Sequence, residues 1–330
     1  MNTANERGVV VSTRVRYARN IEDYPFDLSA SQVMRDELIL RIKGALGDTF
    51  QEDDMQTLSP NKRLCLCEQH RISPEFMKNA VGALFSKENE GIYLMALEED
   101  HIRLQVIDNG YCPAALLQKA DRLLADLETK LRFSFDEKLG YLTRCPTNLG
   151  HGLRFSVMVF LPGLTSSAEI AALQQNLFDL GFNLRGMYGE GSQSNAFLYQ
   201  ISNRSSLGMT KEALLSEFDA LISRVISAEI AARQRFQRDI LSDSAGRAYG
   251  ILAYAGKMSY EEFLGHYANL RTGYALGLDL PKTCNIELLD ELLILLSPGM
   301  ISEAFACKNS SQRDWERAKL VKMKVRGDQN

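Results

Sequence analysis

Two arginines stand two residues apart in the string Ser12-Thr13-Arg14-Val15-Arg16. On an extended segment, residues i and i+2 project to the same face, so the two guanidinium groups would lie side by side. A planar guanidinium donates forked hydrogen bonds that suit phosphate oxygens. The pair therefore indicates a place where a phosphate could bind, although arginine pairs on edge strands are usually only solvated.

Three acidic residues are adjacent in the string Glu98-Glu99-Asp100-His101-Ile102-Arg103, which lies between two apolar runs. Adjacent carboxylates are unfavourable together unless they lie at a surface or in a site that uses their charge. The alternative interpretation is the polar turn of a hairpin, and this string alone would favour it.

Two glycine-containing loops carry further charged or reactive side chains. One loop, Cys145-Pro146-Thr147-Asn148-Leu149-Gly150-His151-Gly152-Leu153-Arg154, leads into an apolar run that starts at Phe155. In the other, Arg185-Gly186-Met187-Tyr188-Gly189-Glu190-Gly191-Ser192, an arginine and a glutamate flank a turn whose glycines allow close backbone approach. The sequence has no G-x-x-x-x-G-K-[ST] loop, so nucleotide phosphates would have to be neutralised in another way.

In this order and spacing, the four strings resemble the catalytic domain of the phosphagen (guanidino) kinase family, which includes arginine and creatine kinases. The match runs over about residues 10 to 235. The resemblance implies transfer of a phosphoryl group from ATP to a guanidinium group. It also implies that Mg²⁺ is held mainly through the phosphates and water, and not by metal ligands of the protein.

The resemblance assigns roles residue by residue. The arginine cage around the ATP phosphates is matched by Arg14, Arg16, Arg103, Arg154 and Arg185. The residues expected around the nucleotide are Ser12, Thr13, Arg14, Val15, Arg16, His70, Arg103, Arg154, Phe155, Ser156, Val157, Met158, Arg185, Gly186, Met187, Tyr188, Gly189 and Glu190. The catalytic set is Glu98, Glu99, Cys145 and Glu190, with Glu99 as base, Glu190 as its partner carboxylate and Cys145 beside the guanidinium.

The chemistry agrees with these roles. A guanidinium has a pKa above ~12, so as a cation it is a poor nucleophile. A carboxylate placed on it can accept its proton as attack on phosphorus proceeds. Phosphoryl transfer needs mainly positioning and charge neutralisation, which two carboxylates and five arginines with Mg²⁺ would supply.

Two features favour arginine side chains of proteins as the substrate. Small-molecule phosphagen kinases carry a helical domain before the arginine-pair motif, which here starts at Ser12, so we expect a more open site. The string Arg313-Asp314-Trp315-Glu316-Arg317-Ala318 resembles the phosphoarginine-binding motif of bacterial protein arginine kinases. On a helix Arg313 and Arg317 would share a face, which implies phosphoarginine binding by Arg313, Asp314, Arg317 and Ala318.

Two alternatives remain open: a kinase of free arginine or another small guanidine, and a non-catalytic adaptor that binds phosphoarginine. Intact cage arginines and carboxylates speak against the adaptor. Three departures from the family pattern leave rate and specificity uncertain: Leu97 where asparagine is usual, His151 where threonine is common, and Gln193 where glutamate is usual.

The periodicity of apolar residues predicts the strands and helices that carry these side chains. Strand-like runs are Val9–Ser12, Leu64–Cys67, Ile92–Ala96, Ile102–Ile107, Phe155–Leu161 and Ala196–Ser202. Helical runs are Met34–Leu46, Ala115–Leu131, Ser167–Leu180, Lys211–Gln234, Ala245–Ala255, Tyr260–Leu276, Ile286–Leu296 and Arg313–Met323. We therefore expect an α+β catalytic domain over 1–240, with a largely antiparallel sheet flanked by helices, and an all-helical domain over 241–330 that also serves dimerisation by resemblance.

Composition and charge indicate the cellular compartment and the classes of partner that we expect for this protein. The formal net charge of −4 lacks the basic excess of a general nucleic-acid binder. No apolar run is long enough for a membrane span, and the first residues lack the apolar core of a secretory signal, so we expect a cytoplasmic protein. Cys65, Cys67 and His70 are weak metal-ligand candidates, because no second ligand pair follows at zinc-like spacing. The resemblance adds protein substrates, an activator protein, protease-chaperone machinery and a homodimer as expected partners.

Overall fold

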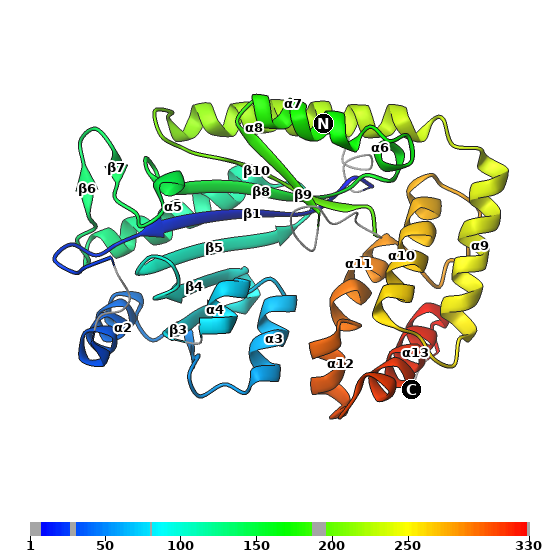
Figure 1. Cartoon of the computed structure of the whole chain (residues 1–330), viewed down its shortest axis with the longest axis horizontal. Coiled ribbons are helices and arrows are strands. Elements are labelled where there is room, and N and C mark those ends of the chain that lie inside the picture. The colour runs from blue at the N-terminus through cyan, green and yellow to red at the C-terminus, as the bar shows by residue number, and fades with distance from the viewer. Residues whose placement is uncertain (1–7, 27–30, 80, 187–195, 329–330) are drawn as a thin grey trace.

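The computed structural model describes residues 8–26, 31–79, 81–186 and 196–328. The strands are β1 (Val10–Arg19), β2 (Gln51–Asp54), β3 (Ala83–Lys87), β4 (Ile92–Ala96), β5 (Ile102–Asn109), β6 (Phe135–Asp136), β7 (Gly140–Tyr141), β8 (Leu153–Phe160), β9 (Phe182–Gly186) and β10 (Leu198–Asn203). Eight of them form one sheet in the order β2-β3-β4-β5-β1-β8-β10-β9, and β6 and β7 form a separate hairpin. Every neighbouring pair in the large sheet is antiparallel, which confirms the predicted fold class (Figure 1).

Helices surround this sheet and continue beyond it. They are α2 (Gln32–Leu46), α3 (Pro60–Glu68), α4 (Pro74–Asn79), α5 (Pro113–Glu128), α6 (Pro162–Ser166), α7 (Ile170–Asp179), α8 (Lys211–Arg233), α9 (Arg238–Tyr254), α10 (Tyr260–Ala275), α11 (Ile286–Leu295), α12 (Pro298–Phe305) and α13 (Ser310–Arg326). The last five pack together beside one end of the sheet (Figure 1). The predicted domain limit at residue 240 falls in the first turn of α9.

One face of the sheet is apolar because strand side chains alternate between faces. Val15 and Tyr17 of β1 lie in the same buried cluster as Leu104 of β5 and Phe155 and Val157 of β8. The helices α5, α7 and α8 supply the other side of this cluster, with residues such as Leu116, Leu177 and Phe218. This core makes the sheet a rigid support for whatever its other face carries.

Among the described residues, helices cover the opposite face at its two ends. Over β3 and β4, α3 and α4 pack Leu66 and Phe76 against Leu84 and Met95. At the other end, Phe160 of β8 and Leu198 of β10 join the core of α9–α13. The middle of this face, on β5, β1 and β8, is therefore left for polar side chains.

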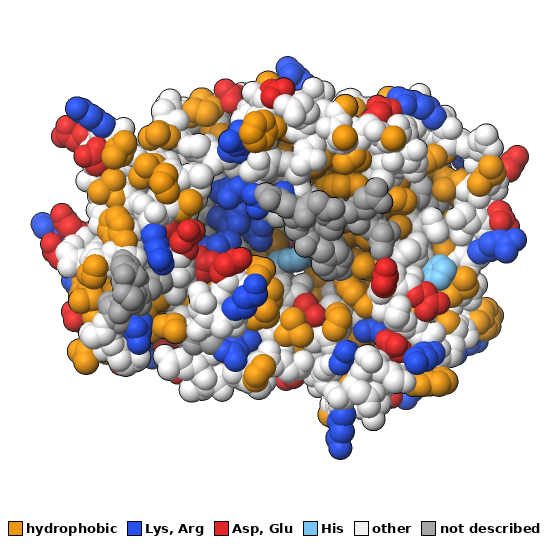
Figure 2. Space-filling model, viewed as in Figure 1, with side chains coloured by type: hydrophobic (Ala, Val, Ile, Leu, Met, Phe, Trp, Pro, Cys, Tyr) orange, Lys and Arg blue, Asp and Glu red, His pale blue; other side chains and the backbone are white. Residues whose placement is uncertain are grey.

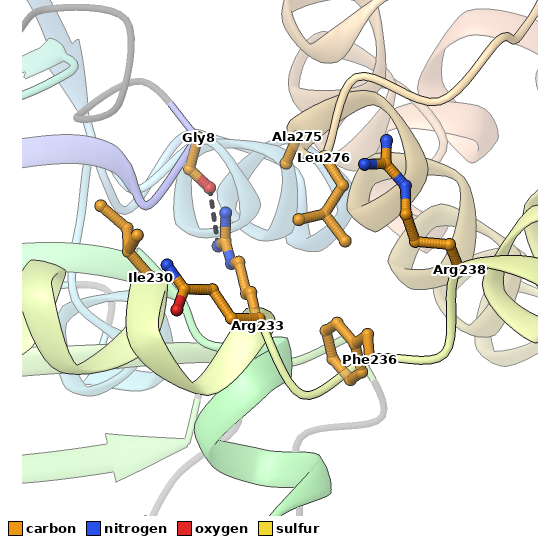
Figure 3. Close-up of a pocket in the computed structure, with 8 residues that line it drawn as sticks. Gly8, Ile230, Arg233, Phe236, Arg238, Ala275 and Leu276 are labelled. Carbon is orange, nitrogen blue, oxygen red and sulfur yellow. Dashed lines mark hydrogen bonds between the residues drawn. The ribbon is translucent and has the colours of Figure 1, made fainter.

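The sheet and the helical part are joined through buried arginines near the start of β1. Arg233, at the end of α8, donates to the carbonyl oxygens of Gly8 (2.9 Å) and Phe160 (3.1 Å), and Arg271 of α10 also donates to Gly8 (3.2 Å). A cavity of about 430 Å³ lies at this junction, lined by Gly8, Ile230, Arg233, Gln234, Phe236, Arg238, Ala275 and Leu276 (Figure 3).

Some predicted elements are wrong. The run Leu64–Cys67 is not a strand but lies within α3. Ser59 caps this helix by accepting from the amide of Lys62, and Pro60 occupies the first turn, a helix-start signature that outweighs the alternation of apolar residues. The predicted helix Ser167–Leu180 begins later than expected, at Ile170 of α7, because Ser167 ends α6 and Ala168 takes a left-handed backbone conformation (φ 58°). The sequence pattern does not predict the strands β2, β3, β6, β7 and β9.

Within the described residues, no helix is both long enough and apolar enough to span a lipid bilayer.

Candidate active site

Strand register brings the predicted cage arginines to the sheet face opposite the main core. Arg16 of β1 lies directly opposite Arg154 of β8, and Arg14 lies opposite Ser156. Residues opposite each other in an antiparallel pair project to the same face. On the other side of β1, Arg103 of β5 is opposite Ala18, two residues beyond Arg16, and so it shares this face as well.

Arg185 reaches the same face from the far edge. It pairs with Gln200 of β10, which pairs with Met158 of β8, two residues from Ser156. Figure 2 shows cationic side chains gathered in a hollow over the middle of the sheet, with acidic side chains along one side of it. The five arginines that the sequence set apart are therefore neighbours on one face.

These arginines repel one another, because burial and the neighbouring cations disfavour their charge. Burial, followed by the charges of Arg103 and Arg154, lowers the pKa of Arg14 to about 9. Burial, followed by Arg14, Arg103 and Arg154, also lowers the pKa of Arg16. The Nε atoms of Arg16 and Arg154 are buried without a hydrogen-bond partner. In the described ranges Arg14, Arg16 and Arg154 form no ion pair, so this face is suited to bind a polyanion.

Glu98 holds one cage arginine in place. Its Oε1 accepts from Nη1 of Arg103 (2.7 Å) and from Oγ of Ser73, and its Oε2 accepts from the backbone amide of Glu99 (2.8 Å). Burial alone would raise the pKa of Glu98, but Arg103, Ser73 and the Glu99 amide outweigh burial and lower it. Glu98 is thus an ionised anchor for Arg103 and is itself buried.

The three residues after Glu98 differ in their contacts and in their exposure to solvent. Asp100 Oδ1 accepts from Nδ2 of Asn20 (2.7 Å) and from the backbone amide of Arg144 (2.7 Å), which ties the turn to the loop before Cys145. His101 Nδ1 accepts from the amide of Ile21 (2.9 Å). Both side chains face inward, whereas Glu99 is exposed toward solvent.

Glu99 has the properties of a general base. Its pKa is raised by partial burial first and then by the charges of Asp100 and Glu98, while Arg103 and Arg144 oppose the shift. A carboxylate with a raised pKa accepts a proton more readily, which is what deprotonation of a guanidinium during attack requires.

Leu97 begins this turn in a left-handed backbone conformation, with φ 64°. Its amide donates to the carbonyl of His101 (3.0 Å), which closes the turn. Asparagine tolerates this conformation better than leucine does, which gives a physical meaning to the departure noted from the family pattern. The leucine side chain is buried in the core below the sheet, which offsets the backbone strain.

The loop that carries Cys145 is fixed between a hairpin and the strand β8. Gly150 donates to the carbonyl of Leu139 (2.8 Å), and Tyr141 donates to the carbonyl of Gly150 (2.8 Å). A Cβ on Gly140 would lie 2.4 Å from the Gly150 oxygen, so this contact needs glycine. Cys145 Sγ lies 3.0 Å from Oγ1 of Thr147. The charges of Cys145 and Glu99 both raise the pKa of Arg154, against the dominant effect of burial, so all three groups share one site.

His70 lies beside the cage and is held by a residue that was not predicted. Burial and then the charge of Arg14 lower the pKa of His70 to about 4, so the imidazole is neutral near neutral pH. Gln105, opposite Arg16 on the sheet, donates to the carbonyl oxygens of His70 (2.7 Å) and Arg71 (2.8 Å). The spacing of two between Arg103 and Gln105 could have revealed that Gln105 faces the site.

Other supporting residues carried no local signal. Ser202 of β10 accepts from Nη2 of Arg154 (3.4 Å). Ser73 and Asn20 act on Glu98 and Asp100 from distant parts of the chain. Only the tertiary fold shows that these common polar residues belong to the site.

The structure does not bring every predicted nucleotide residue to this face. Thr13, Val15, Phe155 and Val157 point to the opposite face and are buried there, so only their backbone could lie near a nucleotide. Ser12 and Met158 are opposite each other on the cage face, and Gly186 ends β9 beside Arg185. Four predicted residues, Met187, Tyr188, Gly189 and Glu190, lie outside the described residues, as does Gln193.

The C-terminal arginine motif lies on α13, as a helix, but its two arginines differ in exposure. Arg317 is buried, and it donates to the carbonyls of Leu296 (2.8 Å) and Met258 (3.0 Å) and to Asp314 (2.8 Å). Arg313 is partly exposed and close enough to contribute to the lowered pKa of Arg317, whose main cause is burial. In this conformation Arg317 holds the helical part together, and Ala318 is buried beside it.

The donor set also bears on Mg²⁺. Within the described ranges, no group of three or more His, Cys, Asp or Glu side chains is arranged to hold a metal ion. The arginine hollow suits phosphates and would repel a bare cation. A Mg²⁺ ion carried on the phosphates of a nucleotide is compatible with both observations.

Two family models match the chain almost end to end. Residues 38–232 match ATP:guanido phosphotransferase, C-terminal catalytic domain. Residues 238–330 match Protein-arginine kinase McsB C-terminal domain. Among curated relatives, the protein-arginine kinase of Caldanaerobacter subterraneus subsp. tengcongensis is 34% identical over 328 residues and 96% of each chain is covered. That of Symbiobacterium thermophilum is 35% identical over 336 residues, covering 98% of this chain and 95% of its own.

Solved structures give a consistent fold. The duplicated taurocyamine kinase from Schistosoma mansoni with bound transition state analog components matches with a TM-score of 0.59 and 26% identity, covering 78% of this chain and 36% of that chain. Lombricine kinase matches with a TM-score of 0.60 and 24% identity, covering 71% of this chain and 69% of that chain. At this identity the second match supports the fold alone.

Proposed function

Because the chain belongs to the ATP:guanido phosphotransferase family, and within it to the protein-arginine kinases, we propose that it transfers the γ-phosphoryl group of ATP to arginine side chains of proteins. The observation that carries the proposal is the array of arginines on one sheet face beside Glu99, of which Arg14, Arg16 and Arg154 form no ion pair among the described residues. An array of this kind favours a triphosphate, and the carboxylate at its edge favours a guanidinium.

The proposed reaction forms a nitrogen–phosphorus bond and breaks an oxygen–phosphorus bond of ATP. A guanidinium nitrogen of the substrate forms the N–P bond, the bond from phosphorus to the bridging oxygen of ADP breaks, and ADP leaves with the electron pair. Glu99 takes the proton that the attacking nitrogen gives up. Arg14, Arg16 and Arg154 neutralise the phosphate oxygens as charge shifts toward ADP. Mg²⁺ bound to the nucleotide would add further positive charge.

Glu98, Asp100 and Gln105 act on this centre indirectly. Glu98 orients Arg103, Asp100 fastens the Cys145 loop, and Gln105 fastens the His70 segment. We retain Cys145 beside the substrate guanidinium on the basis of the family resemblance, and its proximity to Arg154 supports this role. We retain Glu190 as the partner of Glu99 on the basis of the family resemblance.

The decisive experiment offers the enzyme ATP with a protein such as casein or with free arginine. Phosphoarginine is acid-labile, so mass spectrometry under non-acidic conditions should detect it on the protein. Glu99→Ala should lower kcat by about 10²- to 10⁴-fold and leave ADP binding nearly unchanged. Phosphate found only on free arginine would favour a small-guanidine kinase, and no transfer to any guanidine would favour a phosphoarginine-binding adaptor.

We further propose that the string from Arg313 to Ala318 binds phosphoarginine and thereby couples the product to activity. Arg313 is the accessible member, and Arg317 would have to exchange one of its present acceptors for phosphate. Calorimetry with phosphoarginine should show weaker binding for Arg313→Ala together with Arg317→Ala. Because Arg317 also supports packing, Arg313→Ala alone is the cleaner variant, and unchanged affinity would remove the idea.

The family resemblance also motivates a cellular role. We propose that the mark directs cytoplasmic proteins to a protease-chaperone system during stress, with an activator protein and a homodimeric enzyme. Deleting the gene should abolish phosphoarginine in the proteome and slow the turnover of damaged proteins. Unchanged turnover with loss of the modification would separate the chemistry from this role.

A further inference from the structure

The carboxylate of Glu68 joins α3, which packs on the sheet, to the helical part of the molecule near the nucleotide face. Glu68, the last residue of α3, accepts from Oγ of Ser297 (2.6 Å) and from the backbone amides of Gly299 (2.9 Å) and Met300 (3.1 Å). These groups are the start of α12, so Glu68 caps a helix of the other part of the molecule. The capping charge is favourable at this end of a helix dipole.

The helices α3 and α12 approach each other closely where Glu68 meets Gly299. A Cβ on Gly299 would lie 2.7 Å from Oε2 of Glu68 and 2.9 Å from Cγ of Leu64, so a larger residue there would force the Glu68 carboxylate, Leu64 or α12 to shift. Asn61, two turns earlier on α3, donates to Glu303 (2.6 Å) at the outer edge of the same junction. The junction therefore extends along one side of α3 and is tightest at its end.

The end of α3 is also where the nucleotide face begins. The backbone turns sharply within two residues of Glu68, because His70 takes a left-handed conformation (φ 59°) and its amide donates to the carbonyl of Cys67. His70 then lies beside Arg14, close enough for that charge to lower the imidazole pKa. Gln105 holds the turn from the sheet side. Glu68 holds it from the helical side.

We propose that Glu68 is a positioning residue for the nucleotide, and that through it the helical part completes the nucleotide site. This inference rests on the proposed function, because it takes the face around Arg14 and His70 as the place where ATP binds. If the Glu68 contact is lost, α3 and the His70 turn are held only from the sheet. Nucleotide binding then weakens, while the guanidinium site around Glu99 and Cys145 keeps its own support.

The test is a comparison of Glu68→Ala with Glu303→Gln in the full-length chain. Calorimetry with MgADP should give about tenfold weaker binding for Glu68→Ala, the size expected for loss of a charged hydrogen bond, and less than twofold change for Glu303→Gln. Kinetics should show the same rise in KM for ATP, with kcat and KM for the protein substrate nearly unchanged. Glu68→Gln, which keeps one acceptor oxygen, should recover part of the affinity.

A second variant reaches the contact from the other side. Gly299→Ala should push α12 away from Glu68 and weaken MgADP binding in the same way. Unchanged affinity in both variants would overturn the proposal, and so would a parallel loss of kcat, both KM values and the unfolding midpoint, which would indicate general damage. If the wild type binds MgADP but phosphorylates no protein, the proposed substrate fails while the role of Glu68 is still decided by calorimetry.

Discussion

Two groups of buried arginines in this molecule have opposite surroundings. Arg271 of α10 is fully buried and makes a two-pronged contact with Asp290 (2.8 and 3.0 Å) and a third bond to the carbonyl of Gly8. Among the described residues, the charges that act most on Arg14 and Arg16 on the sheet face are those of other arginines, with Glu98 acting against them on Arg16. The charge of Arg271 is compensated within the protein, whereas the charges of Arg14 and Arg16 are suited to an anionic ligand.

The effect of each environment on protonation shows the same contrast. Burial alone would lower the pKa of Arg271, but Tyr267 and Asp290 outweigh burial and raise it. The pKa of Arg14 is lowered to about 9 by burial and by its arginine neighbours. At these two sites, the charge that the fold stabilises, Arg271, supports the structure, whereas the charge that the fold destabilises, Arg14, is available for an anionic ligand. Four experiments test whether Arg271 and the sheet-face arginines differ in this way.

The largest effect is expected for Arg271→Met. It leaves Asp290 and the Gly8 carbonyl without their partner, so the free energy of unfolding should fall by about 3 kcal/mol. Urea denaturation measures the change, and the double variant with Asp290→Leu should recover part of it. Activity per folded molecule should stay close to that of the wild type. A variant as stable as the wild type would contradict a structural role for Arg271.

Arg16→Met should have the opposite effects, a large loss of activity and no loss of stability. Loss of one phosphate-facing charge should lower kcat about 10²- to 10³-fold. Because the folded state lowers the pKa of Arg16, it disfavours the cation at neutral pH, and a neutral side chain of similar length should leave the unliganded protein equally or more stable. Steady-state kinetics and urea denaturation on the same preparation measure both. Destabilisation as large as that of Arg271→Met would show that the two groups do not differ.

A polyanion should bind at the sheet-face arginines, Arg14 and Arg16, and not at Arg271. At a hundredfold excess over its Kd, MgADP should add about 2.7 kcal/mol to the free energy of unfolding of the wild type. The gain should shrink at high salt, which screens the arginines, and it should be nearly absent in Arg16→Met. Thermal unfolding with and without MgADP is the measurement. An equal gain in Arg16→Met would place the nucleotide elsewhere.

The smallest effect is the pH dependence of the rate. Glu99 must be ionised to act as base, and its pKa is raised, so activity should begin to fall at a higher pH than an ordinary glutamate would require. Below that pKa, kcat/KM should drop about tenfold per pH unit. Glu98 should not produce this step, because its pKa is lowered. A rate that stays flat until the protein unfolds would exclude Glu99 as the titrating base.

Much of this site was visible in the sequence because alternation along a strand is a local property. Arg14 and Arg16 could be assigned to one face before the strand had any neighbours. The resemblance then identified the other arginines and Glu99. What could not be predicted depends on register or on distant contacts: that Arg154 stands opposite Arg16, that Gln105 holds His70, and that Ser73 reaches Glu98. The misassigned Leu64–Cys67 run shows the limit of alternation, since a local helix cap at Ser59 decided the element.

By itself, the amino-acid sequence determined the chemistry: a row of arginines, adjacent carboxylates and a cysteine loop, in an order typical of phosphoryl transfer to guanidinium. The tertiary structure alone decided which of the adjacent acids is the anchor and which is exposed, because that depends on Ser73 and Arg103 surrounding Glu98. It also decided which arginines are satisfied, since the carboxylate partner of Arg271 lies on another helix. Charge type is a property of the residue, whereas its compensation is a property of the packed fold.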